Sequence, residues 1–372
     1  MSHFISILIP TKGRIEGLTH LLQSLSQMSE RDSIAHEILI INNATDETRA
    51  GKVEALVQGY IEREGDRWRH VREPIAGKSR ALNTGLTLAR GAILGFLDDD
   101  VVVAPSWLTV THNFFAQLPC DVQQGSIHIP PEFAEDKEFL RLLSRYRTIY
   151  YLMKPFAEGE KIKSLNAANL AVRRELFDRT GYFDERLGPG ASGTSMDSEF
   201  GDRVKRLGGR LGYEPRAVVY HQVDRSRLTD KYFRWRNEAE GRSNLLYKDI
   251  TPIDALSNLL RSAASFCYYW LAGSEHKKYR MKGRCFRYRA MLRVMLQERR
   301  NFQTPIPDLQ KQRVITGPCL SNQNLPHGER RLRHRFWPAV KFRAGSDSAA
   351  TSSARANVDI QSSTPTTFRD EN

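Results

Sequence analysis

Hydrophobic and polar positions repeat with two different periods over the first hundred residues. Short runs of branched apolar residues are typical of buried strands, and apolar residues three or four positions apart are typical of helices that bury one face. The expected strands span 4–9, 37–41, 68–71 and 91–97, and the expected helices span 18–25, 53–61 and 79–89. Strands that alternate with helices over short connections form βαβ units with a parallel sheet. The pattern therefore predicts an α/β fold.

The rest of the chain changes character twice. Residues 101–225 mix both periods and become irregular near 188–194. A helical and increasingly basic pattern follows, and beyond it the apolar periodicity fades into a segment with few large apolar residues. We predict an α/β domain at 1–228, a helical, basic, amphipathic extension at 229–302, and an irregular, largely disordered tail at 303–372.

An apolar stripe with basic neighbours runs through the extension. Its members recur at helical spacing, and they are Met281, Cys285, Tyr288, Leu292 and Met295. Two interpretations remain open. The stripe packs on the α/β domain while its charged neighbours face water, or it lies on an anionic membrane surface, as basic amphipathic helices can.

Composition adds a strong charge to this picture. The 372 residues include 56 Lys and Arg against 43 Asp and Glu, which gives a formal net charge of +13. This excess suits an anionic partner, such as nucleotide phosphates or an anionic membrane, although an ordinary solvated surface also fits it. We expect no nucleic-acid partner, because the basic residues form no known readout motif.

Targeting patterns and cysteine spacing suggest a compartment. The chain does not open with a basic segment followed by an apolar one, and it has no run of about eighteen apolar residues, so neither a signal peptide nor a spanning helix is predicted. The four cysteines match no zinc or redox spacing. We expect a cytoplasmic protein, with peripheral attachment to the inner face of the membrane if the extension binds lipid.

Three consecutive carboxylates, Asp98, Asp99 and Asp100, follow the strand predicted at 91–97. Such neighbours repel one another unless a positive group lies among them. Mg²⁺ and Mn²⁺ prefer carboxylate oxygens and often bridge to phosphates. Because ligands of open α/β sheets bind beyond the carboxyl ends of the strands, the triplet predicts a metal–phosphate site. An acidic loop, or a helix N-terminus near Pro105, is the plainer alternative.

Four segments in a fixed order carry a family resemblance. They span 6–14, 38–48, 77–100 and 166–221; the third begins with Gly-Lys-Ser and ends in the acidic triplet, and the fourth contains Met-Asp-Ser-Glu at 196–199. Together they resemble glycosyltransferase family 2 over about residues 4–225. The resemblance implies a GT-A fold, which is Rossmann-like with a mostly parallel sheet, and a nucleotide-sugar donor.

The resemblance also implies roles for particular residues. It assigns the metal, Mn²⁺ or Mg²⁺, to Asp100, Asp98 and His221. It assigns the catalytic base to Asp197, with Glu199 as the next candidate. The implied donor-binding residues are Pro10, Thr11, Lys12, Arg14, Asn42, Lys78, Arg80, Asp98 and Asn169. Plainer readings stay open, since carboxylates also favour helix N-termini and a lone His or Asn at a strand end is often structural.

The function implied is inverting, metal-dependent transfer of a sugar. The donor is a nucleotide-sugar, expected to be UDP-linked, and the acceptor is a hydroxyl of a glycan or lipid-linked glycan in polysaccharide or glycoconjugate biosynthesis. Processive members of the family show Gln-x-x-Arg-Trp, and here Lys231 takes the place of Gln before Arg234 and Trp235. We therefore expect addition of one or a few sugars.

Two rival functions remain. A sugar nucleotidyltransferase also binds nucleotide, metal and sugar phosphate on an α/β sheet, although the segment after the first strand is a poor match to its glycine-rich signature. A catalytically silent nucleotide-sugar or membrane-binding protein is the other rival. Asn42 and Met196 support it, because they stand where the family usually has carboxylates.

Overall fold

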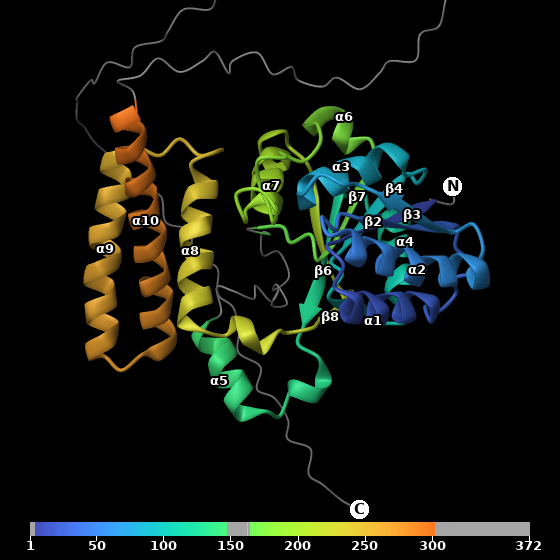
Figure 1. The fold of residues 1–372 in the computed structure, drawn as a ribbon, viewed down its shortest axis with the longest axis horizontal. Coiled ribbons are helices and arrows are strands. Elements are labelled where there is room, and N and C mark those ends of the chain that lie inside the picture. Colours follow the sequence, from blue (N-terminus) through green and yellow to red (C-terminus); the bar gives the residue numbers. More distant parts are fainter. Residues whose placement is uncertain (1–3, 147–161, 163, 302–372) are drawn as a thin grey trace, which may run out of the picture. The chain divides into compact units, whose positions relative to one another are not determined.

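The computed structural model describes residues 4–146, 162 and 164–301, and the tail predicted at 303–372 lies outside them. The described residues belong to one compact unit and form a sheet of eight strands in the order β3-β2-β1-β4-β7-β6-β8-β5 (Figure 1). The strands are β1 (Ile5–Thr11), β2 (His36–Asn42), β3 (Trp68–Arg72), β4 (Ile93–Leu97), β5 (Val101–Val103), β6 (Val122–His128), β7 (Asn169–Arg173) and β8 (Leu211–His221). The helices are α1 (Ile15–Ser26), α2 (Glu47–Glu64), α3 (Lys78–Leu88), α4 (Trp107–Gln117), η1 (Pro131–Phe133), α5 (Lys137–Arg145), α6 (Leu176–Thr180), α7 (Met196–Arg206), η2 (Arg225–Arg227), α8 (Asp230–Asn244), α9 (Pro252–Leu271) and α10 (Glu275–Asn301).

The sheet is mostly parallel, which confirms the predicted α/β class. β1 pairs in parallel with β2 and β4, β2 with β3, and β6 with β8. The antiparallel pairs are β4 with β7, β6 with β7, and β5 with β8. Because β1, β2 and β4 run in the same direction, Thr11, Asn42 and the acidic triplet reach the same edge of the sheet.

Helices cover both faces of the sheet. Alternate residues of a strand point to opposite faces, so Ile7 of β1 packs in the core with α1, α2 and α4, whereas Leu8 packs in the core with α3, α6 and α7. The apolar stripe predicted for the first helix is buried in full, and it consists of Leu18, Leu21, Leu22 and Leu25. This packing holds the strand ends, and the polar residues that follow them, in fixed positions.

Helices α8, α9 and α10 form the extension predicted from residue 229, and Thr229 caps the N-terminus of α8. Aromatic side chains of α5, α8 and α10, among them Phe139, Phe233 and Phe286, share a third core. Of the predicted apolar stripe, Met281 is buried and the other members are partly buried between neighbouring helices. None of the helices in the described part of the chain is long and apolar enough to cross a membrane.

Candidate active site

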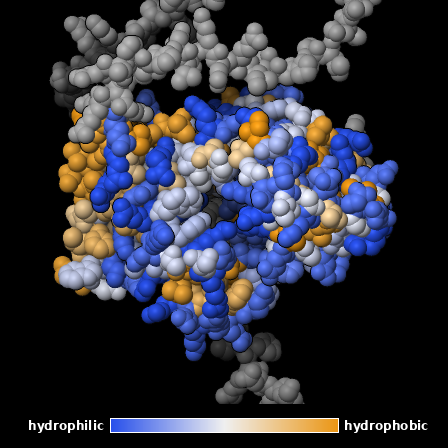
Figure 2. Space-filling model, in the orientation of Figure 1, coloured by the Kyte–Doolittle hydropathy of each residue, from blue (hydrophilic) through white to orange (hydrophobic). Residues whose placement is uncertain are grey.

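A cavity of about 1420 Å³ lies at the carboxyl edge of β1 and β4 and extends to α8 and α10. Figure 2 shows a hollow near the centre of this face, bordered by hydrophilic side chains. The residues singled out from the sequence that line it are Pro10, Thr11, Lys12, Arg14, Lys78, Asp98, Asp99, Asp100, Met196, Asp197 and His221. Segments that lie 200 residues apart in the chain therefore meet at one site.

Three of these residues form a candidate metal centre. The ligand atoms of Asp98, Asp100 and His221 all lie within 4.8 Å of one another. The sheet topology causes this meeting, because β5 follows the acidic triplet directly and pairs with the end of β8, where Val101 lies opposite His221. Two carboxylates and one imidazole are a donor set that suits Mn²⁺.

The hydrogen bonds around this centre orient its ligands. Nδ1 of His221 lies 2.9 Å from the carbonyl oxygen of Gln222 and donates to it, which fixes the orientation of the ring. Nε2 lies 3.6 Å from Oδ1 of Asp100. That Oδ1 atom is buried and accepts no hydrogen bond from the residues that the structure describes. A buried carboxylate oxygen in this state fits a metal ligand, because buried polar atoms otherwise find a donor.

Cationic side chains surround the acidic triplet. Arg14 forms ion pairs with both Asp99 and Asp100, and Lys78 forms one with Asp98. Although burial alone would lower the pKa of the Lys78 ammonium, the charge of Asp98 raises it above its ordinary value. Asp99 also accepts a hydrogen bond of 2.6 Å from Thr11 Oγ1, which ties the triplet to the end of β1.

Lys12 is a further cation that lines the cavity. Burial lowers the pKa of its ammonium group, and the positive charge of Arg14 lowers it further. Cations crowded in this way are stabilised by an anion, because an opposite charge at short range favours their charged form. The part of the cavity lined by Lys12, Arg14, Lys78 and the acidic triplet, here called its inner half, therefore suits a diphosphate.

Asp197 lines the same cavity at the start of α7. Its Oδ2 accepts a hydrogen bond of 3.3 Å from the Ala167 amide, and its Oδ1 accepts one of 3.1 Å from the Ser198 amide. Glu199, the alternative candidate, is bound by Arg203 through contacts of 3.0 and 2.7 Å and is not among the lining residues. Asp197 is thus the carboxylate of this helix that faces the cavity.

Three residues predicted to bind the donor lie outside the cavity lining. Asn42 is fully buried, and its amide donates to the Ala50 carbonyl at 2.9 Å. Arg80 forms an ion pair of 2.6 Å with Glu185. Asn169 accepts a hydrogen bond from the Trp107 indole and donates to the carbonyl groups of β6 and β8. The described contacts of these side chains are therefore with other parts of the protein.

The neighbour of Asn42 takes a place that the sequence did not predict. Asn43 lines the cavity, and its side chain donates to the carbonyls of Glu73 and Ile75 and accepts from the Gly77 amide at 2.9 Å. It therefore holds the segment that leads into Lys78. Successive residues of an extended chain point to opposite sides. The side chain of Asn42 therefore points into the protein, whereas that of Asn43, the next residue, lines the cavity.

The glycine-rich segment before Asp197 is another part of the site that sequence reasoning missed. Residues 188–195 all line the cavity. Gly193 has a φ of +105°, and a Cβ there would lie 3.2 Å from the Cβ of Ala239 in α8. Ser243 of α8 also donates to Ser192 Oγ at 2.7 Å. The helical extension therefore supports the loop that positions Asp197.

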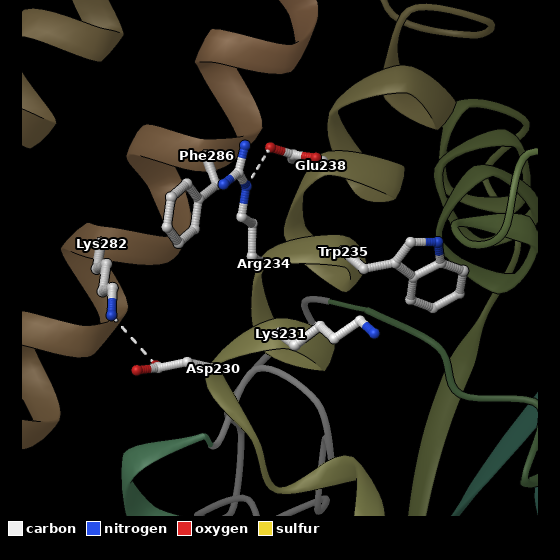
Figure 3. Close-up of a pocket in the computed structure, with 7 residues that line it drawn as sticks. All are labelled: Asp230, Lys231, Arg234, Trp235, Glu238, Lys282 and Phe286. Atoms are coloured by element: carbon white, nitrogen blue, oxygen red, sulfur yellow. Dashed lines mark hydrogen bonds and ion pairs between the residues drawn. The ribbon is translucent and has the colours of Figure 1, made fainter.

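A second pocket of about 510 Å³ lies between α8 and α10 (Figure 3). Four of its five charged side chains are paired with each other, since Lys282 contacts Asp230 at 3.1 Å and Arg234 contacts Glu238 at 2.9 Å. Figure 3 shows Trp235 directed away from Phe286, and Trp235 also lines the large cavity. The chemistry of the protein is therefore to be sought in the large cavity.

Comparisons with known proteins agree with this geometry. Residues 6–181 match the family model described as Glycosyl transferase family 2. None of the curated proteins matches the sequence. Mannosyltransferase PcManGT from Pyrobaculum calidifontis, solved in complex with GDP-Man and Mn²⁺, is similar with a TM-score of 0.50 and 16% identity over 79% of this chain and 87% of that chain. Residues 1–349 of TarS from S. aureus, in complex with UDP-GlcNAc, give a TM-score of 0.45 and 16% identity over 70% of each chain.

The parallel sheet with a carboxylate-rich cavity at its edge defines a glycosyltransferase with the GT-A fold. The family model covers the chain from β1 through α6, and this part of the chain is similar to glycosyltransferase family 2. Asp197 and His221 lie beyond the matched residues, and the folded chain brings both to the same cavity.

Proposed function

We propose that this enzyme transfers one sugar from a nucleotide-sugar donor to an acceptor hydroxyl, with inversion and with the help of a divalent cation. The observation that carries the proposal is the position of Asp98, Asp100 and His221 in the same cavity as Asp197. Such a reaction needs charge neutralisation at the diphosphate and a base at the acceptor. The cavity offers groups suited to both tasks.

The residues at the candidate metal centre fit the cation. Asp100 and Asp98 would hold it through carboxylate oxygens, and His221 through Nε2. When bound, the cation would supply Lewis-acid stabilisation of the negative charge on the diphosphate. Lys12, a cation of the inner half, would add to this electrostatic stabilisation at the donor phosphates.

Asp197 takes the role of general base in this proposal. Its two oxygens accept hydrogen bonds from backbone amides, which orient the carboxylate toward the cavity. The carboxylate would accept the proton of the acceptor hydroxyl while that oxygen attacks the anomeric carbon. A single displacement of this kind inverts the configuration at that carbon, and the nucleoside diphosphate leaves with the electron pair of the broken bond.

Calorimetric titration tests the donor site. We expect UDP and its sugar conjugates to bind in the presence of Mn²⁺ and to bind at least about tenfold more weakly after chelation, since the cation would offset the charge of the diphosphate. GDP and its conjugates serve as the comparison. Tighter binding of GDP than of UDP would indicate that the donor is GDP-linked. Binding without transfer or hydrolysis would favour the silent protein, and release of pyrophosphate from a nucleoside triphosphate and a sugar phosphate would favour the nucleotidyltransferase.

We further propose that the helical extension docks on an anionic membrane. One face of α9 exposes large apolar side chains over its whole length; Ile253 is 77% exposed, Leu260 62% and Leu271 78%. Apolar side chains gather on the α9 side of the molecule in Figure 2. Residues 255–293 contain nine Lys or Arg and one acidic residue, Glu275. This combination complements anionic lipid and would oppose the pairing of two like-charged copies.

Flotation with liposomes measures this association. We expect the protein to float with vesicles that contain 30% phosphatidylglycerol and to stay at the bottom with pure phosphatidylcholine. Leu260→Glu should reduce the floating fraction about tenfold, because it places a negative charge on the apolar face. Leu118→Glu, at an exposed position away from α9, is the matched control. Loss of flotation in both variants, or in neither, would contradict the proposal. A dimer that forms with increasing protein concentration would indicate that the apolar face of α9 binds a second copy of this chain.

A further inference from the structure

The outer half of the large cavity has a lining that the donor site does not use. It comes from residues after 181, where the family match ends. The polar members of this part are Arg227, Arg236, Glu240, Arg242, Lys248, Asp249 and Arg287, and the apolar members are Leu245, Leu246, Ile250, Pro252, Val294 and Met295. The outer half therefore combines guanidinium groups with an apolar wall.

Within the part of the chain that the structure describes, two nitrogen atoms of this lining are buried without a hydrogen-bond partner. They are Nη1 of Arg236 in α8 and Nε of Arg287 in α10. A guanidinium nitrogen always carries a proton at physiological pH, so each of these atoms is an unused donor. Leaving such a donor unpaired in a buried position is costly, and the usual explanation is a bound water or anion.

The two arginines differ in how far their charge is already compensated. Arg287 donates to Glu240 at 2.6 Å, which leaves its Nε as the free donor. Arg236 forms no ion pair within the described part of the chain. Arg242, six residues further along α8, is exposed and lines the cavity as well. An anion beside Arg236 would therefore lie in a region with an excess of positive charge.

Phosphate is the anion that this wall suits best. Guanidinium groups bind phosphate through paired, charge-assisted hydrogen bonds, and arginine is favoured wherever such recognition occurs. Donors from α8 and α10 that converge on one anion would satisfy both unpaired atoms together. A neutral glycan hydroxyl would leave the charge of Arg236 uncompensated.

The apolar residues of this lining connect the cavity with the N-terminal end of α9. Ile250 and Pro252 line the cavity, and Ile253, the next residue of α9, begins the exposed apolar face of that helix. Val294 and Met295 of α10 add to the same wall. An apolar chain attached to a phosphate would thus lie against apolar side chains along its path toward the surface of α9.

We propose that the outer half of the cavity binds the acceptor through a phosphate group held by Arg236 and Arg287, with an apolar chain against the wall that leads to α9. The inference rests on the proposed function, since it names the acceptor of the same reaction as a lipid that carries phosphate. In this arrangement Arg236 is a binding residue for the acceptor, and it does not contact the donor.

Titration of n-decyl phosphate below its critical micelle concentration tests this site. We expect binding to the full-length protein, with an affinity at least about tenfold higher than that for inorganic phosphate or for uncharged n-decyl glucoside. Arg236→Gln should weaken decyl phosphate binding by about tenfold or more, because a charge-assisted hydrogen bond is lost. Arg289→Gln removes an exposed arginine of α10 that does not line the cavity, and it should leave the affinity unchanged.

Each outcome of this experiment decides a separate question. Equal affinities for inorganic phosphate and decyl phosphate would show that the apolar chain does not contribute, which contradicts a lipid acceptor. An unchanged affinity for decyl phosphate in Arg236→Gln would show that Arg236 does not bind the phosphate. Titration of UDP with Mn²⁺ on Arg236→Gln should give the wild-type affinity, which also shows that the variant is folded. If nucleotides bind and decyl phosphate does not, this inference fails while the proposed function stands. If decyl phosphate binds and no nucleotide does, the proposed function fails, and the site binds a lipid phosphate that is not the acceptor of that reaction.

Discussion

Asp100→Asn is expected to remove metal-dependent donor binding and to lower kcat/KM by about a thousandfold, which corresponds to about 4 kcal/mol. Oδ1 of Asp100 is buried, accepts no hydrogen bond from the described residues and lies 3.6 Å from Nε2 of His221. The substitution keeps the size of the side chain but removes the negative charge that a divalent cation needs. Calorimetry with UDP in the presence and absence of Mn²⁺, together with initial rates, measures both effects.

The control for this variant must separate loss of the metal from loss of the fold. Asp100 also forms an ion pair with Arg14, so the thermal midpoint of Asp100→Asn should be compared with that of the wild type. Asp46→Asn is a matched change outside the cavity, because Asp46 caps α2 and Asn caps a helix equally well. If metal-dependent binding persists in a folded Asp100→Asn protein, Asp100 does not hold the metal.

The fold of the first hundred residues could be predicted because its signals are local. The strand expected at 37–41 is β2 (His36–Asn42), and the helix expected at 79–89 is α3 (Lys78–Leu88). The helix expected at 53–61 is longer at both ends, since Asp46 caps its start and Gly65 ends it with a φ of +82°. The order of the remaining strands was not predictable in this way. β7 lies between β4 and β6 through pairings that join distant segments.

The family resemblance groups Asp98, Asp100 and His221, and the structure places them together because β4 and β8 both end at this edge of the sheet. The interior position of Asn169 could not be predicted, because it depends on Trp107 of α4 and on the carbonyl groups of two other strands. The outer half of the cavity was hidden for a similar reason. Arg236 and Arg287 lie on different helices and line the same cavity only because α8 packs against α10.

Asp197→Asn is expected to preserve donor binding and to lower kcat by a factor of about 100 to 10,000, the range typical of a lost general base. Asn is close in size to Asp and retains an oxygen that can accept from the Ala167 amide, now at 3.3 Å. It cannot accept the proton of the acceptor hydroxyl at neutral pH. The change therefore affects the transition state and leaves the binding of the nucleotide in the ground state intact. Single-turnover rates and calorimetry on the same preparation separate the two quantities.

Two further variants show whether the proton acceptor is Asp197 or Glu199. Glu199→Gln changes the carboxylate that Arg203 binds, and we expect it to affect stability more than the rate constant of a folded enzyme. Asp178→Asn is the neutral control, because Asp178 is exposed on α6. A full rate in Asp197→Asn would exclude Asp197 as the base, and a loss of rate in Glu199→Gln with an unchanged thermal midpoint would assign the role to Glu199. Since Asp197 lines the cavity and Glu199 does not, the geometry favours Asp197.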